Sequence, residues 1–179
     1  MTWERILKNC RKYDCYPTIE TFFSTCPPLI RNYLTLQTIP AGQLLIQAGA
    51  PCGTVYILVS GRLQAIEEKA GEIPYSFFDL SPFDIVGDYE LFSEDAESYV
   101  TVRAWEPSAC LTIPPGFYLQ WLSTDSTALF FRTRLLMKKL SLQLNSSRRY
   151  LLMSYGQRCM YVISQEAGKV TPVNGICSL

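Results

Sequence analysis

The arrangement of apolar and polar residues sets the middle of the chain apart from its two ends. Between residues 34 and 114 the apolar stretches are short, rich in β-branched and aromatic residues, and separated by Gly and Pro turns. Strands are predicted at 34–39, 43–46, 54–59, 62–67, 75–80, 99–104 and 110–113, with a short extended piece at 85–87. The run Thr54–Val59 is apolar throughout, so we expect it to be buried on both faces. Short strands at this spacing indicate a β-sandwich or β-barrel.

Helical patterns flank this β-rich part on both sides. Residues 1–34 contain short amphipathic stretches that prolines interrupt, so short helices are expected there. A short helix is predicted over 117–122, and a longer one from about Thr127 to Asn145, which Asp125 or Ser126 can cap. A last helix is predicted over 148–166, with an interruption near Gly156.

The longer C-terminal helix carries a broad apolar face. Leu129, Leu136 and Leu140 fall on one stripe at helical spacing. Neighbouring residues widen the stripe: Phe131, Leu135 and Leu142. A helix this apolar is not expected to stand alone in water, so we expect it to pair with a second copy of the chain. Four basic residues along this part form either a solvated helix face or a nucleic-acid patch: Lys138, Lys139, Arg148 and Arg149.

The composition fits a folded protein without membrane or catalytic features. Hydrophobic residues make up 48% and charged residues 18%, and 16 basic residues balance 16 acidic ones, so no overall field draws the chain to nucleic acid. No apolar run approaches the ~20 residues of a membrane span, and the charged N-terminus lacks a secretion signal, so we expect a cytoplasmic protein with no membrane contact. With no histidine, nucleophile–base pair or glycine-rich nucleotide loop, we expect no enzyme activity and no cofactor.

Glycine turns and apolar strands follow one another in a recognisable order. A turn at Gly42 and a loop at Gly49 precede the apolar strand that ends at Gly61, and the segment Phe83–Asp88 follows. This order, over residues 30–165, resembles the cyclic-nucleotide-binding superfamily, specifically the catabolite-activator and fumarate-nitrate-regulator family of bacterial transcription regulators. The resemblance implies an α+β fold: a double-stranded β-helix (jelly-roll-like) barrel, flanked by short N-terminal helices and a long C-terminal dimerisation helix.

The family that the chain resembles binds its ligand in a phosphate-binding cassette. The cassette opens with Gly-Glu, forms a short helix whose N–H groups receive the cyclic phosphate, and closes with an Arg that pairs with it. The Glu accepts a hydrogen bond from the ribose hydroxyl. In this chain Gly87 keeps its place, Asp88 replaces the Glu, and Ser98, eleven residues after Gly87, stands where the Arg belongs.

The candidate effector-binding residues are those of this degenerate cassette: Gly87, Asp88, Tyr89, Glu90, Leu91, Ser98 and Tyr99. Arg103 lies five residues beyond Ser98, and an odd offset in a strand aims it at the opposite face. The segment is also rich in acidic residues: Glu90, Glu94, Asp95 and Glu97. A buried phosphate would meet repulsion without a counter-charge, so we expect cyclic-nucleotide binding to be lost or weak.

The seven cysteines are spaced irregularly, and free buried thiols are the simplest interpretation. One branch of the resembled family holds an iron–sulfur cluster on closely spaced N-terminal cysteines. The corresponding candidates are more widely spaced here, so we expect no metal: Cys10, Cys15, Cys26 and Cys110. A thiol redox switch is a further alternative.

Aromatic residues are frequent around the cassette. They are Tyr75, Phe77, Phe78, Phe83, Tyr89 and Phe92. Packing in the core is the expected role, and lining a pocket for an apolar effector is the alternative.

These features predict a helical segment at 1–34, a barrel at 35–124, a dimerisation helix at 125–146 and a C-terminal helix and tail at 147–179. Residues 157–163 resemble the first helix of the family's winged helix-turn-helix, but the eleven residues after Gly168 cannot hold the rest.

We therefore expect a homodimeric sensor that contacts DNA only if a longer parent chain or a partner supplies the helix-turn-helix domain. A small-molecule effector is a candidate ligand. The alternatives are a non-catalytic dimeric interaction or scaffold module without its own DNA reader, or a cysteine-based redox or iron–sulfur sensor.

Overall fold

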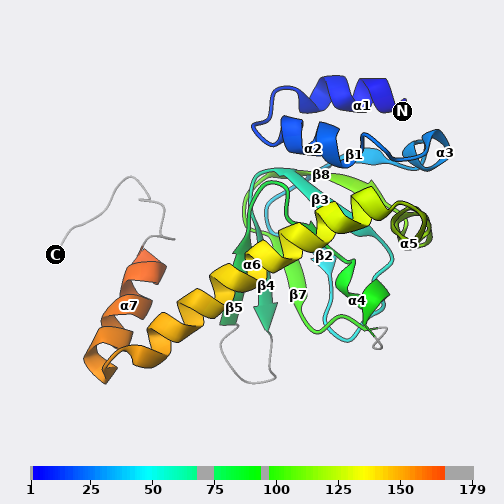
Figure 1. Ribbon diagram of the computed structural model, residues 1–179. Helices are drawn as coiled ribbons and strands as arrows, with labels where there is room; N and C mark the ends of the chain where they lie inside the picture. Colours follow the sequence, from blue (N-terminus) through cyan, green and yellow to red (C-terminus); the bar gives the residue numbers. More distant parts are fainter. Residues whose placement is uncertain (1, 68–74, 94–96, 168–179) are drawn as a thin grey trace, which may run out of the picture. The chain divides into compact units, whose positions relative to one another are not determined.

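The β-rich part forms two four-stranded antiparallel sheets in the computed structural model, which describes residues 2–67, 75–93 and 97–167 (Figure 1). The first sheet has the order β1-β8-β3-β6 and the second β2-β7-β4-β5. The strands are β1 Thr35–Ile39, β2 Leu44–Ile46, β3 Val55–Ser60, β4 Leu63–Glu67, β5 Tyr75–Leu80, β6 Ile85–Val86, β7 Thr101–Ala104 and β8 Ser108–Ile113. The predicted strands are all present, with ends that differ by up to two residues.

Both sheets contribute side chains to one core. Ile39, Leu58 and Cys110 from the first sheet belong to the same buried cluster as Leu63 and Val102 from the second. Strand β3 pairs with β8 on one side and β6 on the other, and most of its side chains are buried, as its apolar sequence predicted. A shared core between two antiparallel sheets confirms the jelly-roll-like α+β fold.

Seven helices lie in the described residues: α1 Trp3–Cys10, α2 Tyr16–Phe22, α3 Pro28–Arg31, α4 Tyr89–Phe92, α5 Pro115–Thr124, α6 Ser126–Leu152 and α7 Tyr155–Ala167. An aromatic cluster joins α2 to elements far away in the sequence. The ring of Phe22 lies 5.7 Å from that of Phe83 and 4.9 Å from that of Trp121 on α5. These contacts fix the N-terminal helices and α5 against the barrel. None of the helices in the described part of the chain has the length and hydrophobicity of a membrane span.

The chain divides into two compact units, residues 1–131 and 132–179. Helix α6 starts where predicted, because the Asp125 carboxylate accepts hydrogen bonds from the N–H groups of Thr127 (3.0 Å) and Ala128 (3.1 Å). Its predicted end is wrong: the helix continues to Leu152, seven residues beyond Asn145. The expected interruption near Gly156 is also displaced, because the break falls before Tyr155 and Gly156 lies inside α7.

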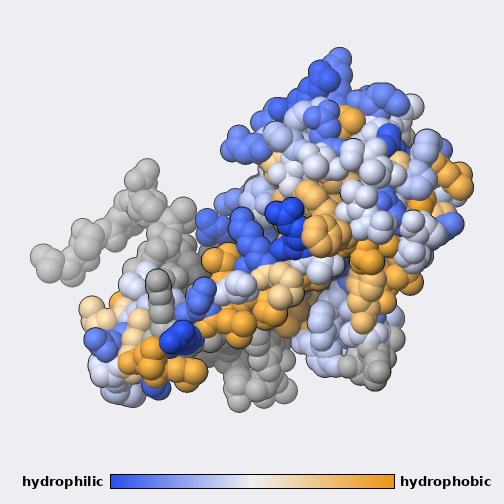
Figure 2. Space-filling model, viewed as in Figure 1, coloured by the Kyte–Doolittle hydropathy of each residue, from blue (hydrophilic) through white to orange (hydrophobic). Residues whose placement is uncertain are grey.

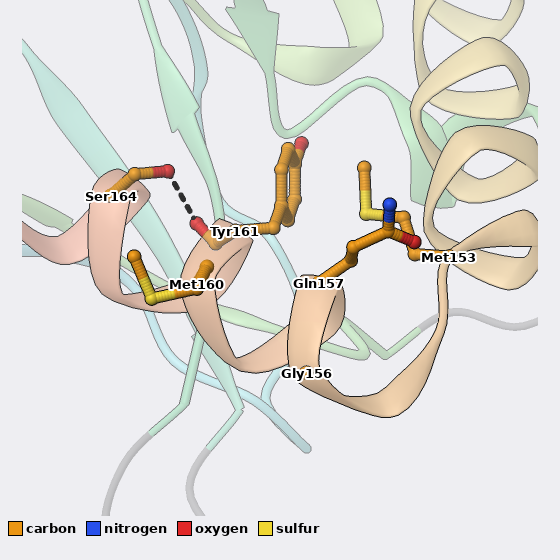
Figure 3. A pocket seen from close by; sticks show the side chains of 6 residues that line it. All are labelled: Met153, Gly156, Gln157, Met160, Tyr161 and Ser164. Atoms are coloured by element: carbon orange, nitrogen blue, oxygen red, sulfur yellow. Dashed lines mark hydrogen bonds between the residues drawn. The ribbon is translucent and has the colours of Figure 1, made fainter.

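A capping box builds the corner between α6 and α7. The Ser154 N–H donates to the side-chain oxygen of Gln157 (2.9 Å), and the Gln157 N–H donates to the Ser154 hydroxyl (3.4 Å). Arg158 donates to the carbonyls of Met153 (3.0 Å) and Leu151 (2.9 Å), which closes the end of α6. The side chains around this corner leave a hollow along α7 (Figure 3), lined by Met153, Gly156, Gln157, Met160, Tyr161 and Ser164.

Candidate functional site

The cassette opens at Gly87, directly after β6. Gly87 is buried with φ +82°, and a Cβ on it would lie 2.5 Å from the Thr54 carbonyl oxygen and 2.6 Å from Cys52 Sγ. Only glycine combines this backbone conformation with so close an approach. The turn at the start of the cassette is therefore set by packing against the loop that precedes β3.

Asp88 follows Gly87 and points its carboxylate toward α5. Its side chain is 3% exposed, and its Oδ2 accepts a hydrogen bond of 3.0 Å from the hydroxyl of Tyr118, which is fully buried. Asp88 stands where the family has the acceptor for a ligand hydroxyl, and its contact with Tyr118 was not predicted from the sequence. Nothing local in the sequence links residues 30 positions apart, so only the fold shows that one carboxylate oxygen is already engaged.

Ser98 stands at the position of the missing Arg. Its side chain and its backbone both form hydrogen bonds with neighbouring loop residues. It is 4% exposed and its hydroxyl donates to the carbonyl of Val100 at 3.0 Å. Its backbone carbonyl accepts from the N–H of Gly49, and its N–H donates to the carbonyl of Ala50. Arg103 lies farther along, in β7, opposite Leu44 and Gln64 in the register of the second sheet.

The charge of the cassette is acidic. The sequence 87–100 contains no Lys or Arg. Among the described residues, the buried Oε2 of Glu90 has no hydrogen-bond partner, and Glu97 is exposed. Glu94 and Asp95 lie outside the described residues. A second anion near the Glu90 carboxylate would add electrostatic repulsion in a partly buried place.

The remaining cassette residues lie mostly at the surface. Tyr89 and Tyr99 form an edge-to-face pair with ring centroids 6.0 Å apart, and they are 61% and 59% exposed. Leu91 is half-buried and Phe92 is exposed. The prediction that these aromatic residues pack in the core is confirmed for Phe83 and is wrong for Tyr89 and Phe92. The side chains of Tyr75, Phe77 and Phe78 are not among those that the structure describes.

The four cysteines considered as cluster ligands lie on different elements. Cys10 ends α1, Cys26 precedes α3, and Cys110 lies in the core between the sheets. Cys15 donates its thiol to the carbonyl of Val59 at 3.1 Å. Within the described part of the chain, no three His, Cys, Asp or Glu side chains come together as a metal-binding group. The iron–sulfur alternative therefore has no assembled site there.

Burial keeps these thiols protonated. It raises the pKa of Cys10 to about 11 and those of Cys26 and Cys110 to about 12, from an ordinary value of 9.0. A thiol that stays neutral is a poor nucleophile and a poor redox sensor. Free buried thiols remain the interpretation that fits the structure best.

These raised pKa values predict a loss of stability at alkaline pH. Above pH 9 the unfolded chain releases thiol protons that the folded chain retains, so the free energy of unfolding falls between pH 9 and about 12. Urea unfolding at several pH values measures this slope. The variant Cys26→Ala is expected to reduce the slope, whereas Cys159→Ala, which removes an exposed thiol, leaves it unchanged. Equal slopes in both variants contradict the prediction.

The leucines predicted at the dimer interface are exposed on α6. Leu129 is 41% exposed, and Leu136 and Leu140 are both 46% exposed. Further large apolar side chains on this helix are also exposed: Phe130, Met137, Leu142, Leu144, Leu151 and Leu152. Figure 2 shows hydrophobic surface along α6. Exposed apolar surface on this scale is typical of a protein–protein contact region.

The comparisons with known proteins agree with this architecture. Residues 36–125 match the model of the cyclic nucleotide-binding domain. Among solved structures, the c-di-GMP responsive global regulator CLP of Xanthomonas campestris is 21% identical, with a TM-score of 0.64 and coverage of 83% of this chain and 70% of that one. The catabolite activator protein of Thermus thermophilus is 19% identical, with a TM-score of 0.55 and coverage of 73% and 64%. A putative transcriptional regulator of the crp/fnr family from Eubacterium rectale is 17% identical, with a TM-score of 0.64 and coverage of 78% and 65%.

At these identities the solved structures show a shared fold, and the chain spans about two thirds of their length. A search of the curated proteins found no match. The family match covers half of the chain and coincides with the two sheets and the cassette described above. The chain belongs to the cyclic nucleotide-binding domain family.

Proposed function

We propose that this chain is the effector-sensing and dimerisation region of a transcription regulator, and that its cassette no longer binds cyclic nucleotides strongly. The observation that carries the proposal is Ser98, a buried serine at the position where the family places its phosphate-binding Arg. The structural relatives named above are transcription regulators, which supports a regulatory rather than a catalytic role. Contact with DNA then requires a helix-turn-helix domain from a longer parent chain or from a partner.

The charges around the cassette support an effector that is not a phosphate ester. A phosphate there would lack the paired bonds of an Arg and would face the Glu90 carboxylate oxygen, which has no donor among the described residues. A cation or a neutral molecule avoids both costs. We therefore propose that the effector site comprises the turn from Gly87 to Leu91 together with Ser98 and Tyr99, and that it accepts a non-anionic ligand.

We propose a separate role for each of the segments that were predicted from the sequence. We propose that residues 35–124 sense the effector, that residues 125–146 dimerise, and that residues 147–179 lead toward the DNA-binding part; of these last, 168–179 lie outside the described residues. The exposed leucines of α6 support the second assignment. A scaffold without an effector is the second candidate, because Gly87 is already packed against Thr54 and Cys52.

Calorimetry with cyclic AMP and cyclic GMP tests the proposal. We expect no binding at micromolar concentrations, because the cassette lacks the charge-assisted bonds of an Arg. The variant Ser98→Arg is expected to strengthen any weak binding by about 1.5–3 kcal/mol. Thr38→Arg, which adds the same charge on exposed β1, serves as the control and changes nothing. Micromolar or tighter binding by the natural chain would overturn the proposal.

A further inference from the structure

The charged side chains of helix α6 are all positive. Residues 126–152 contain six basic residues and no Asp or Glu: Arg132, Arg134, Lys138, Lys139, Arg148 and Arg149. Three of these side chains are exposed and follow one side of the helix, because Lys138 lies four residues and Arg148 two heptads after Arg134. Arg134, Lys138 and Arg148 are called the basic side of α6 below.

The basic side lies next to the apolar surface that is proposed to dimerise. On the helix circumference Phe130 and Met137, which are 66% and 55% exposed, fall between the predicted leucine stripe and Arg134. When two copies pair through this surface, two helices with six positive charges each approach one another, and neither has a carboxylate to offset them. Like charges oppose the pairing. A counter-charge from another part of the second copy would therefore stabilise the dimer.

The cassette carries the complementary charge. Its residues 87–100 contain five carboxylates and no Lys or Arg. Glu97 is exposed, and the buried Oε2 of Glu90 has no hydrogen-bond partner among the described residues. Their sequence neighbours Tyr89 and Tyr99 are 61% and 59% exposed and form an edge-to-face pair. These four residues are called the acidic–aromatic surface. Carboxylates and exposed aromatic rings both attract guanidinium and ammonium groups.

We propose that the basic side of α6 in one copy docks on the acidic–aromatic surface of the second copy. In a two-fold symmetric dimer this contact occurs twice. The non-anionic group that the cassette accepts is then an Arg or Lys side chain of the protein itself. Arg134 suits this role, because a planar guanidinium pairs with a carboxylate and stacks on an aromatic ring. The inference rests on the proposed dimer and names a partner for the proposed effector site.

Two charge-reversed forms of the full chain test this contact. One carries Glu90→Lys and Glu97→Lys, and the other carries Arg134→Glu and Lys138→Glu. Each form by itself brings like charges together at both contacts, so its dimer is expected to be at least about tenfold weaker than the natural one. In a mixed dimer both contacts join opposite charges. Native mass spectrometry of the mixture is therefore expected to show mainly mixed dimers, and about 1 M salt is expected to abolish this preference.

The matched control is Arg5→Glu and Lys8→Glu on α1. Both residues are exposed, so this form has the same change of charge away from α6. It is expected to dimerise like the natural chain and to show no preference for the form with Lys at 90 and 97. Because Glu90 is half-buried, the experiment is repeated with Glu97→Lys alone, which alters an exposed position only.

The outcomes separate this contact from the dimer itself. Reversed forms that dimerise as strongly as the natural chain and mix statistically would overturn the contact and leave the dimer standing. Reversed forms that are weakened but not rescued by mixing would also overturn it, because the charges then do not meet across two copies. A monomeric natural chain would remove both the dimer and the contact. The calorimetry with cyclic nucleotides is independent of all three results.

Discussion

Replacing Gly87 by alanine is expected to destabilise the barrel strongly, through both backbone strain and overpacking. The added Cβ would lie 2.5 Å from a backbone oxygen of Thr54 and 2.6 Å from Cys52 Sγ, and the φ of +82° is unfavourable for alanine. Backbone strain of about 1–3 kcal/mol and overpacking of about 1–3 kcal/mol act together here. We expect a loss of about 3 kcal/mol or more in the free energy of unfolding, measured by urea titration.

The variant Gly42→Ala separates the effect of backbone strain from that of overpacking. Gly42 has almost the same φ, +81°, but a Cβ there has no atom within 4 Å, so only the backbone strain applies. We expect about 1 kcal/mol for this variant. Equal losses at both positions would show that the contact with Thr54 and Cys52 yields easily and that a side chain can be accommodated at the cassette turn.

The barrel could be predicted because its signals are local. Runs such as Val55–Val59 fix a strand by composition, and the turns at Gly42, Gly49, Gly61 and Gly87 all have the positive φ that favours glycine. The end of α6 was missed for a local reason too. The capping box of Ser154 and Gln157 marks the start of the next helix, and the prediction overlooked this signal.

The site was harder to predict because its chemistry depends on pairs that are distant in sequence. The cassette and its lost Arg are visible in the spacing from Gly87 to Ser98. The partner of Asp88 is not, because Tyr118 reaches it only after the sheets have brought α5 next to the cassette. Likewise, hydrophobicity alone did not reveal that Tyr89 and Phe92 remain exposed, since a short helix at the surface has no apolar face to bury.

Leu136→Asp is expected to convert the protein from a dimer to a monomer. Light scattering on the natural chain should give twice the chain mass of 20.3 kDa, and the variant should give the chain mass. In a two-fold symmetric interface each substitution counts twice, so two buried leucines are lost at about 1.5–3 kcal/mol each. The two carboxylates must also be desolvated, so the total is on the order of 5 kcal/mol or more, a loss of more than a thousandfold in affinity.

The matched control is Leu29→Asp on α3. Leu29 is 64% exposed, more than the 46% of Leu136, so general surface hydrophobicity predicts a larger effect for the control. The interface hypothesis predicts the opposite, because only Leu136 lies on the stripe with Leu129 and Leu140. A natural chain that is monomeric at micromolar concentration, or a Leu136→Asp variant that stays dimeric, would remove α6 as the dimer interface. Dissociation by Leu136→Asp alone assigns the dimer contact to α6.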